Sequence, residues 1–269
     1  MAILHSMPSS ASGNDSFPAF YASMPPRYRE LFDATAAREH EAIIARRQGH
    51  PANVELWRRV QGANAIVCVV ADDRPGLLSL ICAALVAHGM DVIAVQAYTR
   101  PSDGIRPAEA VDFFWLRRED TSSRAGGKAG AAPVVAAPIL ASDIARIGEA
   151  LRALVIGTLS DDDLLREGRV PPTRLPGAST RVTFGEDPAS HSLILTVETF
   201  DRPGLLLAIT RALFRASVQI LGSEATTKDG RVVDRFTLVE QDGSPIRPQK
   251  RGILQMEVLS AIESLALRP

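Results

Sequence analysis

One segment of this chain occurs twice, and the duplication restricts the folds that the chain can adopt. The segment Asp-Arg-Pro-Gly-Leu-Leu stands at 73–78 and again at 201–206, which is 128 positions further on. Each copy follows an apolar run rich in β-branched residues and opens a run with helical spacing. With the same offset, Ile66 falls on Ile194. The chain is therefore an internal duplication of one domain, which sets the number of domains at two.

A second shared motif lies further along each copy. Val-Asp-x-Phe occurs at 111–114 and at 233–236, and an Asp-Gly pair precedes each instance. The offset between these instances differs from that of the first motif, so the register slips between the two motifs. The slips fall where loops are expected, and loops accept insertions at little cost. The copies therefore share a whole domain.

The first repeated segment has the features of a strand-to-helix turn that binds a ligand. Its Asp suits the helix cap, its Pro suits the first helical position, and its Gly permits close approach by other groups. Backbone N–H groups at such a helix start are free to bind a carboxylate. The same residues also make a purely structural helix start. Two copies in matching contexts favour the binding interpretation.

Residue patterns predict the element order β-β-α-β-β-α in both copies. In the first copy we expect strands at Val54–Trp57 and Ile66–Ala71, a helix at Pro75–His88, strands at Asp91–Thr99 and Ala110–Leu116, and a helix at Ile139–Ile156. In the second we expect strands at Arg181–Phe184 and Ser192–Thr199, a helix at Pro203–Ala216, strands at Val218–Thr227 and Arg231–Glu240, and a helix at about Pro248–Leu267. An antiparallel sheet with two helices on one face is an α+β sandwich. With the short first strand at a sheet edge, each copy is a permuted ferredoxin-like fold.

The remaining segments set the domain boundaries. We expect a disordered tail at 1–26, a helical extension at 27–50 built on one helix from Tyr28 to Gln48, a first domain at 51–158, a linker at 159–180 and a second domain at 181–269. Ser, Gly, Ala and Pro dominate 119–137, which predicts a flexible loop in the first domain. Ser160 precedes three aspartates at 161–163, and a capped helix start explains these acids better than a metal site.

Charge and composition argue against several classes of protein. A net charge of −1 does not suit a nucleic-acid-binding protein, which carries a basic face. No apolar run approaches the length of a membrane span, and residues 1–16 lack the pattern of a secretory signal. Cys68 and Cys82 lie within apolar patterns, so we expect both in the core of a cytoplasmic protein.

Together these residues resemble the ACT domains, a family of small regulatory modules that bind amino acids. The resemblance rests on Asp-Arg-Pro-Gly-Leu-Leu after a strand and on the hairpin that ends in Val-Asp-x-Phe, and it covers about 54–158 and 181–267. The chain is similar in particular to the tandem ACT pair at the C-terminus of bacterial PII uridylyltransferase/uridylyl-removing enzymes. The approach to the second copy from Arg181 to Leu206, and the segment Met24–Tyr28, carry this more specific likeness.

The resemblance implies a regulatory protein that binds a free amino acid, with glutamine favoured, at an interface between two ACT domains. The ligand's carboxylate would lie at the two turns, and Asp73 or Asp201 would either cap the helix or bind the ligand's ammonium group. Four polar residues on the following strands are expected to line the same pocket. The expected ligand-binding residues are Asp73, Arg74, Pro75, Gly76, Leu77, Leu78, Asp201, Arg202, Pro203, Gly204, Leu205, Leu206, Gln96, Thr99, Thr226 and Thr227.

No pattern in the chain predicts a catalytic site. The sequence has no nucleotidyltransferase Gly-Ser with a following Asp-x-Asp, and its five histidines have no metal-ligand spacing. We therefore expect no enzymatic activity, no metal and no cofactor, and a stand-alone sensor that signals through its domain arrangement or a partner protein. Two alternatives are a regulatory subunit that binds a separate catalytic chain and a dimerisation module without a ligand. An open sheet edge favours pairing within the chain or in a homodimer.

Overall fold

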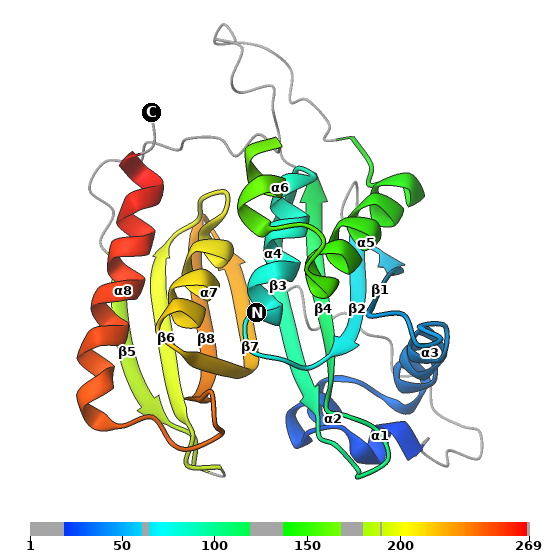
Figure 1. Ribbon diagram of the computed structural model, residues 1–269, viewed down its shortest axis with the longest axis horizontal. Coiled ribbons are helices and arrows are strands. Elements are labelled where there is room, and N and C mark those ends of the chain that lie inside the picture. The colour runs from blue at the N-terminus through cyan, green and yellow to red at the C-terminus, as the bar shows by residue number, and fades with distance from the viewer. Residues whose placement is uncertain (1–18, 61–64, 119–136, 168–179, 189, 268–269) are drawn as a thin grey trace, which may run out of the picture.

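The computed structural model describes residues 19–60, 65–118, 137–167, 180–188 and 190–267. Its centre is one sheet of eight antiparallel strands in the order β1-β2-β4-β3-β7-β8-β6-β5 (Figure 1). The first four strands in this order belong to the first repeat, and the last four belong to the second. The predicted α+β class is therefore confirmed, with two ferredoxin-like sandwiches side by side.

All the strands and helices predicted for the two repeats are present. The strands are β1 Ala52–Arg59, β2 Ala65–Asp72, β3 Met90–Arg100, β4 Glu109–Arg118, β5 Arg181–Glu186, β6 Leu193–Phe200, β7 Val218–Lys228 and β8 Arg231–Glu240. The helices are α1 Ala19–Ser23, α2 Pro26–Leu31, α3 Ala34–Ala45, α4 Leu77–Ala87, α5 Ala141–Ile156, α6 Asp161–Glu167, α7 Leu205–Arg215 and α8 Pro248–Leu267.

The short strand ahead of each repeat occupies an edge of the sheet, as predicted. β1 pairs with β2, and β5 pairs with β6, both in antiparallel register. These outer places are the ones that a strand after the second helix would fill in an unpermuted ferredoxin-like fold. The preceding strand therefore completes each sheet.

The two repeats meet at the centre of the sheet, where β3 pairs with β7. In this pairing Gln96 lies opposite Glu224, and these two residues hold equivalent positions in the two copies. Cys82 of α4 and Thr210 of α7 are a second equivalent pair, and their side chains contact each other. The repeats are thus related by a pseudo-twofold axis through these two pairs, and their interface lies within one chain.

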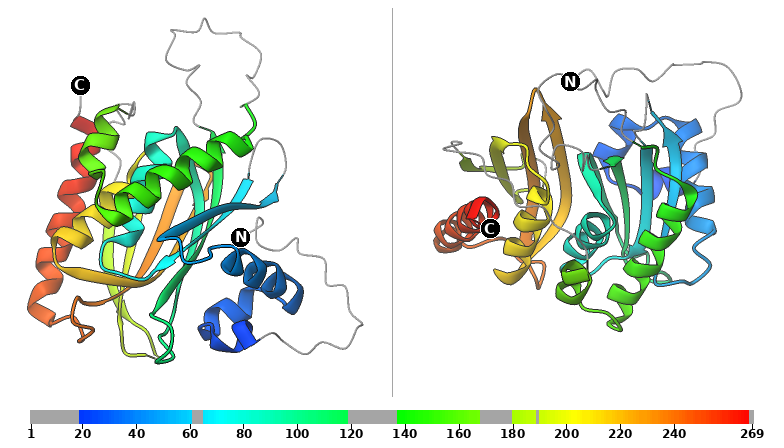
Figure 2. Two further views of the ribbon diagram at one scale, coloured as in Figure 1. Left: turned by 45° about the vertical axis from the view of Figure 1, so that its right-hand side comes forward. Right: turned by 90° about the horizontal axis from the view of Figure 1, so that it is seen from above.

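One face of the sheet carries the helices that both repeats share. Figure 2 shows α4, α5, α7 and α8 along this face. They pack on inward-pointing strand residues such as Phe114 and Phe236, which are fully buried in one continuous core. Each such side chain contributes roughly 1.5–3 kcal/mol by burial. The core continues across the interface, so the two repeats stabilise each other.

The opposite face of the sheet differs between the repeats. On β4, Phe113 and Trp115 point to this face, and α1–α3 cover it (Figure 2). The equivalent residues on β8 are Arg235 and Thr237, of which Arg235 is exposed. A strand with apolar side chains on both faces must be covered on both faces, whereas polar side chains can face water. This difference in sequence explains why the N-terminal helices lie on the first repeat.

The N-terminal helices form a second apolar cluster around Tyr28. Tyr28 is fully buried, and its hydroxyl lies 2.6 Å from Nδ1 of His40. The ring of His40 in turn lies 4.3 Å from those of Trp57 and Phe113. Burial lowers the pKa of His40 to about 3, so the imidazole is neutral at pH 7.

Two predictions for this N-terminal region are wrong. The stretch predicted to end a disordered tail contains α1, and its residues Phe20 and Met24 are buried against the apolar cluster. The single helix predicted at 28–48 is two helices, because Asp33 accepts a hydrogen bond from the N–H of Ala36 at 2.8 Å and caps α3. An aspartate in this position starts a new helix.

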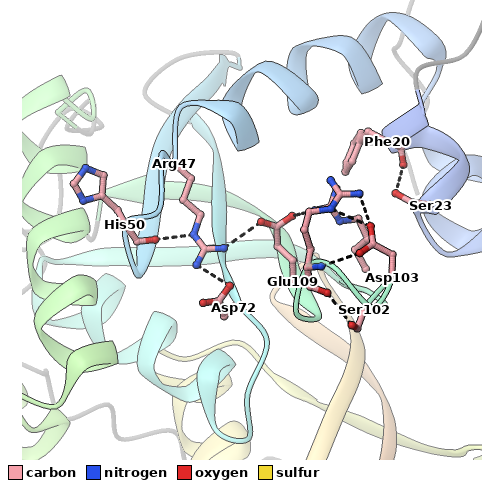
Figure 3. Close-up of polar contacts among 10 residues, drawn as sticks. Phe20, Ser23, Arg47, His50, Asp72, Ser102, Asp103 and Glu109 are labelled. Atoms are coloured by element: carbon pink, nitrogen blue, oxygen red, sulfur yellow. Dashed lines mark hydrogen bonds and ion pairs between the residues drawn. The ribbon is translucent and has the colours of Figure 1, made fainter.

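Ion pairs link the segment that follows α3 to the first repeat, and all of their side chains except Asp72 are largely buried (Figure 3). Arg47 forms ion pairs with Glu109 at 3.1 Å and with Asp72 at 2.8 Å. Arg100 pairs with the other carboxylate oxygen of Glu109 at 2.6 Å. Asp72 directly precedes the first repeated segment, so these pairs connect the N-terminal helices to the strand end that leads into the first turn.

The predictions for the other segments have mixed outcomes. Residues 1–18, 119–136 and 168–179 lie outside the described residues, so the tail, the flexible loop and most of the linker stay predictions. Cys68 and Cys82 are free and buried, as predicted. Oγ of Ser160 accepts a hydrogen bond from the N–H of Asp163 at 3.1 Å, which confirms the predicted cap of α6. Where the structure is described, none of the helices combines the length and apolarity that crossing a membrane requires.

Candidate ligand site at the interface between the repeats

Both repeated segments form a tight turn whose glycine has a left-handed backbone. Gly76 has a φ of 81° and Gly204 a φ of 77°, and α4 and α7 begin at the next residue. Glycine adopts this conformation at little cost. The predicted helix cap by Asp and the predicted Pro at the first helical position are therefore wrong. Asp73 instead lies at the strand end, where its N–H donates to the carbonyl of Ala108 at 2.8 Å.

The arginine of each segment holds the second helix of its own repeat. Nη1 of Arg74 donates to the carbonyl of Val155 at 2.7 Å. Nη1 of Arg202 donates to the carbonyl of Ile262 at 3.4 Å, and its Nη2 donates to Oγ1 of Thr199 at 3.0 Å. Burial lowers the pKa of Arg202. Both guanidinium groups are thus bound to their own repeat, to α5 in the first and to α8 in the second.

Two small cavities lie between the repeats, one beside each turn. The first cavity lies between the turn at Gly76, β3 and β4 on one side and α7 and the start of β7 on the other. The second lies between the turn at Gly204, β7 and β8 on one side and α4 and the start of β3 on the other. Each has a volume of about 30 Å³, which holds roughly two water molecules. Each cavity is complete only when both repeats contribute.

Most of the residues expected to bind a ligand do lie around these cavities. The first cavity is lined by the predicted residues Asp73, Arg74, Gly76, Leu77, Leu78 and Thr99. The second is lined by the predicted residues Asp201, Arg202, Gly204, Leu205, Leu206 and Thr227. Pro75 and Pro203 shape the turns without lining the cavities.

Two of the predicted residues lie on the other face of the sheet. Successive residues of a strand point to opposite faces, so Thr99 and Thr227 point toward the helices while Gln96 and Thr226 do not. Oε1 of Gln96 accepts a hydrogen bond from the hydroxyl of Tyr98 at 3.1 Å. Gln96 and Thr226 therefore lie away from both cavities.

A buried carboxyl group in each cavity is missing from the expected set. Asp112 and Asp234 are the aspartates of the two Val-Asp-x-Phe motifs, and both are almost fully buried (3% and 1% exposed). Burial raises the pKa of each to about 8, so both are mainly protonated at pH 7. The sequence feature that could have identified these residues is an aspartate at an inward-facing position of an apolar strand, which is present in both copies.

The two cavities differ in the hydrogen-bond partners of their carboxyl groups. In the first, Oδ1 of Asp112 accepts the N–H of Tyr98 at 3.1 Å, and Oδ2 of Asp73 accepts from Thr99 at 3.1 Å and from Gln219 at 3.3 Å. The first cavity is therefore internally hydrogen-bonded across the interface.

In the second cavity the corresponding groups have fewer partners. Asp201 lies 3.4 Å from Nη2 of Arg117, which also pairs with Asp91 at 2.5 Å. Within the described part of the chain, Oδ1 of Asp234 has no hydrogen-bond partner. Burial raises the pKa of Asp201, as it does that of Asp73.

The turns also differ in what covers their glycine. A Cβ atom placed on Gly76 would lie 2.8 Å from the ring of Phe214, which reaches across from α7. Among the described residues, a Cβ placed on Gly204 would meet only Leu265 of α8, at 4.0 Å. The residue of the first repeat that is equivalent to Phe214 is Val86, which is smaller. The first turn is thus covered by an aromatic ring from the other repeat, and the second is not.

The contact between the Phe214 ring and Gly76 can be tested by replacing Gly76 with alanine. We expect Gly76→Ala to lower the free energy of unfolding by at least about 1 kcal/mol more than Gly49→Ala does, because the added methyl group meets the Phe214 ring. Gly49 is the matched control, because its φ is 78° and a Cβ added there would have no atom of the described residues within 4 Å. Urea unfolding followed by circular dichroism checks the difference. Equal losses in the two variants would contradict the contact.

In the described segments, no group of three or more His, Cys, Asp or Glu side chains is arranged to hold a metal ion. The polar groups around the cavities are carboxyl groups, hydroxyl groups, the guanidinium groups of Arg74 and Arg202, and the N-termini of α4 and α7. Such an arrangement offers acceptors for an ammonium group and backbone donors for a carboxylate.

Two relatives of the chain among known proteins carry the same name. No family model matches the chain. It is 28% identical over 229 residues to the bifunctional uridylyltransferase/uridylyl-removing enzyme of Rhodospirillum rubrum, a match that covers 82% of the chain and 22% of that enzyme. It is 26% identical over 245 residues to the enzyme of the same name from Phenylobacterium zucineum, covering 89% of the chain and 24% of the enzyme.

Among solved structures, a double-ringed trimeric microcompartment shell protein matches 75% of the chain at 10% identity. Its TM-score of 0.24 is too low to indicate a shared fold. The chain spans less than a quarter of the length of the two enzymes, at 22% and 24%. Homologues of this chain are thus bifunctional uridylyltransferase/uridylyl-removing enzymes, and its α+β structure adds two ferredoxin-like repeats with paired interface cavities.

Proposed function

We propose that this chain is a regulatory module that binds a free α-amino acid, with glutamine favoured, at the interface between its two repeats. The observation that carries the proposal is the paired cavity, in which the N-terminus of a helix and two carboxyl groups face one small space. A free amino acid carries a carboxylate and an ammonium group on one carbon, so it complements this combination. The preference for glutamine follows from the resemblance to the uridylyltransferase/uridylyl-removing enzymes.

Binding would change the relation between the repeats. Each cavity of about 30 Å³ is far smaller than an amino acid, so the lining side chains or the helices α4 and α7 must move apart. The side chains of both repeats line each cavity, and a ligand there would favour one arrangement of the repeats. The size of the shift is limited by the difference in affinity of the ligand for the two arrangements.

Thermal unfolding against each of the twenty amino acids tests the proposal. A ligand at 100 times its dissociation constant stabilises the folded state by about 2.7 kcal/mol, which raises Tm by several degrees. We expect such a shift with glutamine, and its loss in the double variant Asp73→Asn and Asp201→Asn.

The matched control is Asp242→Asn. Asp242 is exposed in the loop between β8 and α8, where its Oδ1 accepts from the N–H of Ser244 at 2.9 Å, and asparagine preserves that acceptor. The control should keep the full response to glutamine. If no amino acid shifts Tm of the unmodified chain, the binding function is wrong, and a purely structural tandem module takes its place.

A further inference from the structure

The two cavities are related by pseudo-symmetry, yet they do not offer a ligand the same contacts. We propose that the second cavity, beside Gly204, is the one that accepts the amino acid, and that the carboxylate of Asp234 receives its ammonium group. The N-terminus of α7 would receive the ligand's carboxylate. This inference rests on the proposed function and goes beyond it by naming one of two sites and the residue that recognises the ligand.

In the first cavity the carboxyl groups already accept hydrogen bonds, and the Phe214 ring covers the turn. Asp112 accepts a backbone N–H, and Asp73 accepts from Thr99 and from Gln219 of the other repeat. The ring of Phe214 lies directly on Gly76, where the ligand would approach the first N–H groups of α4. A ligand would have to break these hydrogen bonds and displace the ring. Both steps reduce the net affinity of the first cavity.

The second cavity contains a polar group that is buried and has no partner. Asp234 is 1% exposed, lines the cavity, and its Oδ1 has no hydrogen-bond partner among the described residues. Most buried polar atoms are hydrogen-bonded, because an unsatisfied one is unfavourable. An ammonium group offers up to three N–H donors and would satisfy this oxygen. The unpaired carboxyl therefore marks a place where a donor from outside the chain fits.

The surrounding charges leave Asp234 available for a cation. The titratable and charged groups around it are Asp201 at the end of β6, Arg202 in the turn, Asp91 on β3, Arg117 on β4 and Cys82 on α4. Arg117 is shared between Asp91 and Asp201, and Arg202 donates to Thr199 and to the carbonyl of Ile262 in α8. The Nη groups of these two arginines are thus engaged elsewhere, Nε of Arg202 is buried without a partner among the described residues, and no cation within this set contacts Asp234.

This assignment also predicts what happens to a proton. Burial and the neighbouring charge of Asp201 raise the pKa of Asp234 to about 8, so in the free protein it is mainly protonated at pH 7. An ammonium group beside it favours the carboxylate form. The carboxyl proton then passes to the buffer as the ligand binds. Glutamine binding at pH 7 should therefore release up to about one proton per chain.

Isothermal titration of the full chain with glutamine tests the assignment, with Asp234→Asn compared with Asp112→Asn. These variants replace equivalent residues of the two repeats and keep the side-chain shape. We expect Asp234→Asn to weaken binding by at least about tenfold, because an amide cannot form the ion pair. Asp112→Asn should bind within about twofold of the unmodified chain. Repeating the titration in buffers of different ionisation enthalpy should show proton release that Asp234→Asn abolishes.

A second pair of variants tests the site without changing a carboxyl group. Val86→Phe places in the second cavity the side chain that covers the first, and we expect it to abolish binding. Phe214→Val removes the cover from the first cavity and should leave the affinity for glutamine within about twofold, or raise the stoichiometry. Circular dichroism and the unfolding midpoint confirm that each variant is folded.

The outcomes separate this inference from the proposed function. Binding that survives Asp234→Asn and Val86→Phe but is lost in Asp112→Asn would place the ligand in the first cavity and overturn the inference, while the proposed function stands. Equal losses in Asp112→Asn and Asp234→Asn would also overturn it, because they would mean two equivalent sites. The absence of glutamine binding to the unmodified chain would overturn the assignment together with the proposed glutamine preference.

Discussion

Replacing Glu109 with alanine is expected to lower the free energy of unfolding by about 3–5 kcal/mol. Glu109 pairs with Arg47 at 3.1 Å and with Arg100 at 2.6 Å, and the three side chains are only 8%, 11% and 7% exposed. Removing the carboxylate leaves the guanidinium group of Arg100 without its ion-pair partner in a buried site, and it leaves Arg47 paired with Asp72 only. Most of the expected loss is the cost of the unpaired buried charge on Arg100, which is larger than the net contribution of the ion pairs themselves.

Urea unfolding followed by circular dichroism measures this loss, and Glu186→Ala is the matched control. Glu186 also has a side-chain partner, Nδ1 of His191 at 2.7 Å from its Oε1, but the side chain of Glu186 is 59% exposed. Exposed pairs contribute about 0–1 kcal/mol, so the control should unfold at nearly the same urea concentration as the unmodified chain. If Glu109→Ala unfolds at the same urea concentration as the control, the three charges are hydrated in solution and this group of ion pairs does not stabilise the fold.

The second large effect is on the pH dependence of stability. Asp112 and Asp234 have pKa values raised to about 8 by burial, against an ordinary value near 4 in the unfolded chain. Between about pH 4 and pH 8 the unfolded chain ionises at these residues while the folded chain keeps them protonated. The unfolded state is therefore favoured increasingly as the pH rises through this window. Each of the two carboxyl groups should lower the free energy of unfolding by a few kcal/mol by pH 8.

The double variant Asp112→Asn and Asp234→Asn removes these ionisations. We expect its free energy of unfolding to exceed that of the unmodified chain by an amount that grows from pH 4 to pH 8. The difference between the two proteins is the quantity to measure, because His40, whose pKa is lowered, contributes a slope of the opposite sign to both proteins. Asp242→Asn should show no such growing difference, since hydrogen bonds from Ser244 lower the pKa of Asp242 and its ionisation falls below this pH range. A constant difference across this range would mean that the two buried carboxyls ionise in the folded protein.

The sequence alone determined the architecture of each repeat, because each element carries a local signal. Alternation of apolar residues located the strands, and i, i+3 and i+4 spacing located the helices, with β8 and α8 at the predicted residues. The offset of 128 between the copies identified the edge strand β1, which propensity alone left ambiguous. The second copy shows the same pattern independently, so an element that is ambiguous in one copy can be assigned from the other.

Only the tertiary structure decided how the repeats meet and what surrounds the cavities. The pairing of β3 with β7, and the contact of Phe214 with Gly76, join residues more than a hundred positions apart, and no local pattern encodes such distances. Side-chain direction on β3 and β7 also depends on register, since a shift of one residue moves a side chain to the other face. That is why Thr99 and Thr227 line cavities and Gln96 and Thr226 do not.

The roles of the two repeated motifs were likewise decided by packing. The glycine of each turn, in a left-handed conformation, starts the helix and leaves Asp73 and Asp201 at the strand ends. The aspartates of Val-Asp-x-Phe, which had no assigned role, became the buried carboxyls Asp112 and Asp234. Burial decides whether such a carboxyl is charged, and burial is a property of the assembled layers. The sequence therefore located the strand-to-helix turns, and only the folded chain showed which acids face the space between the repeats.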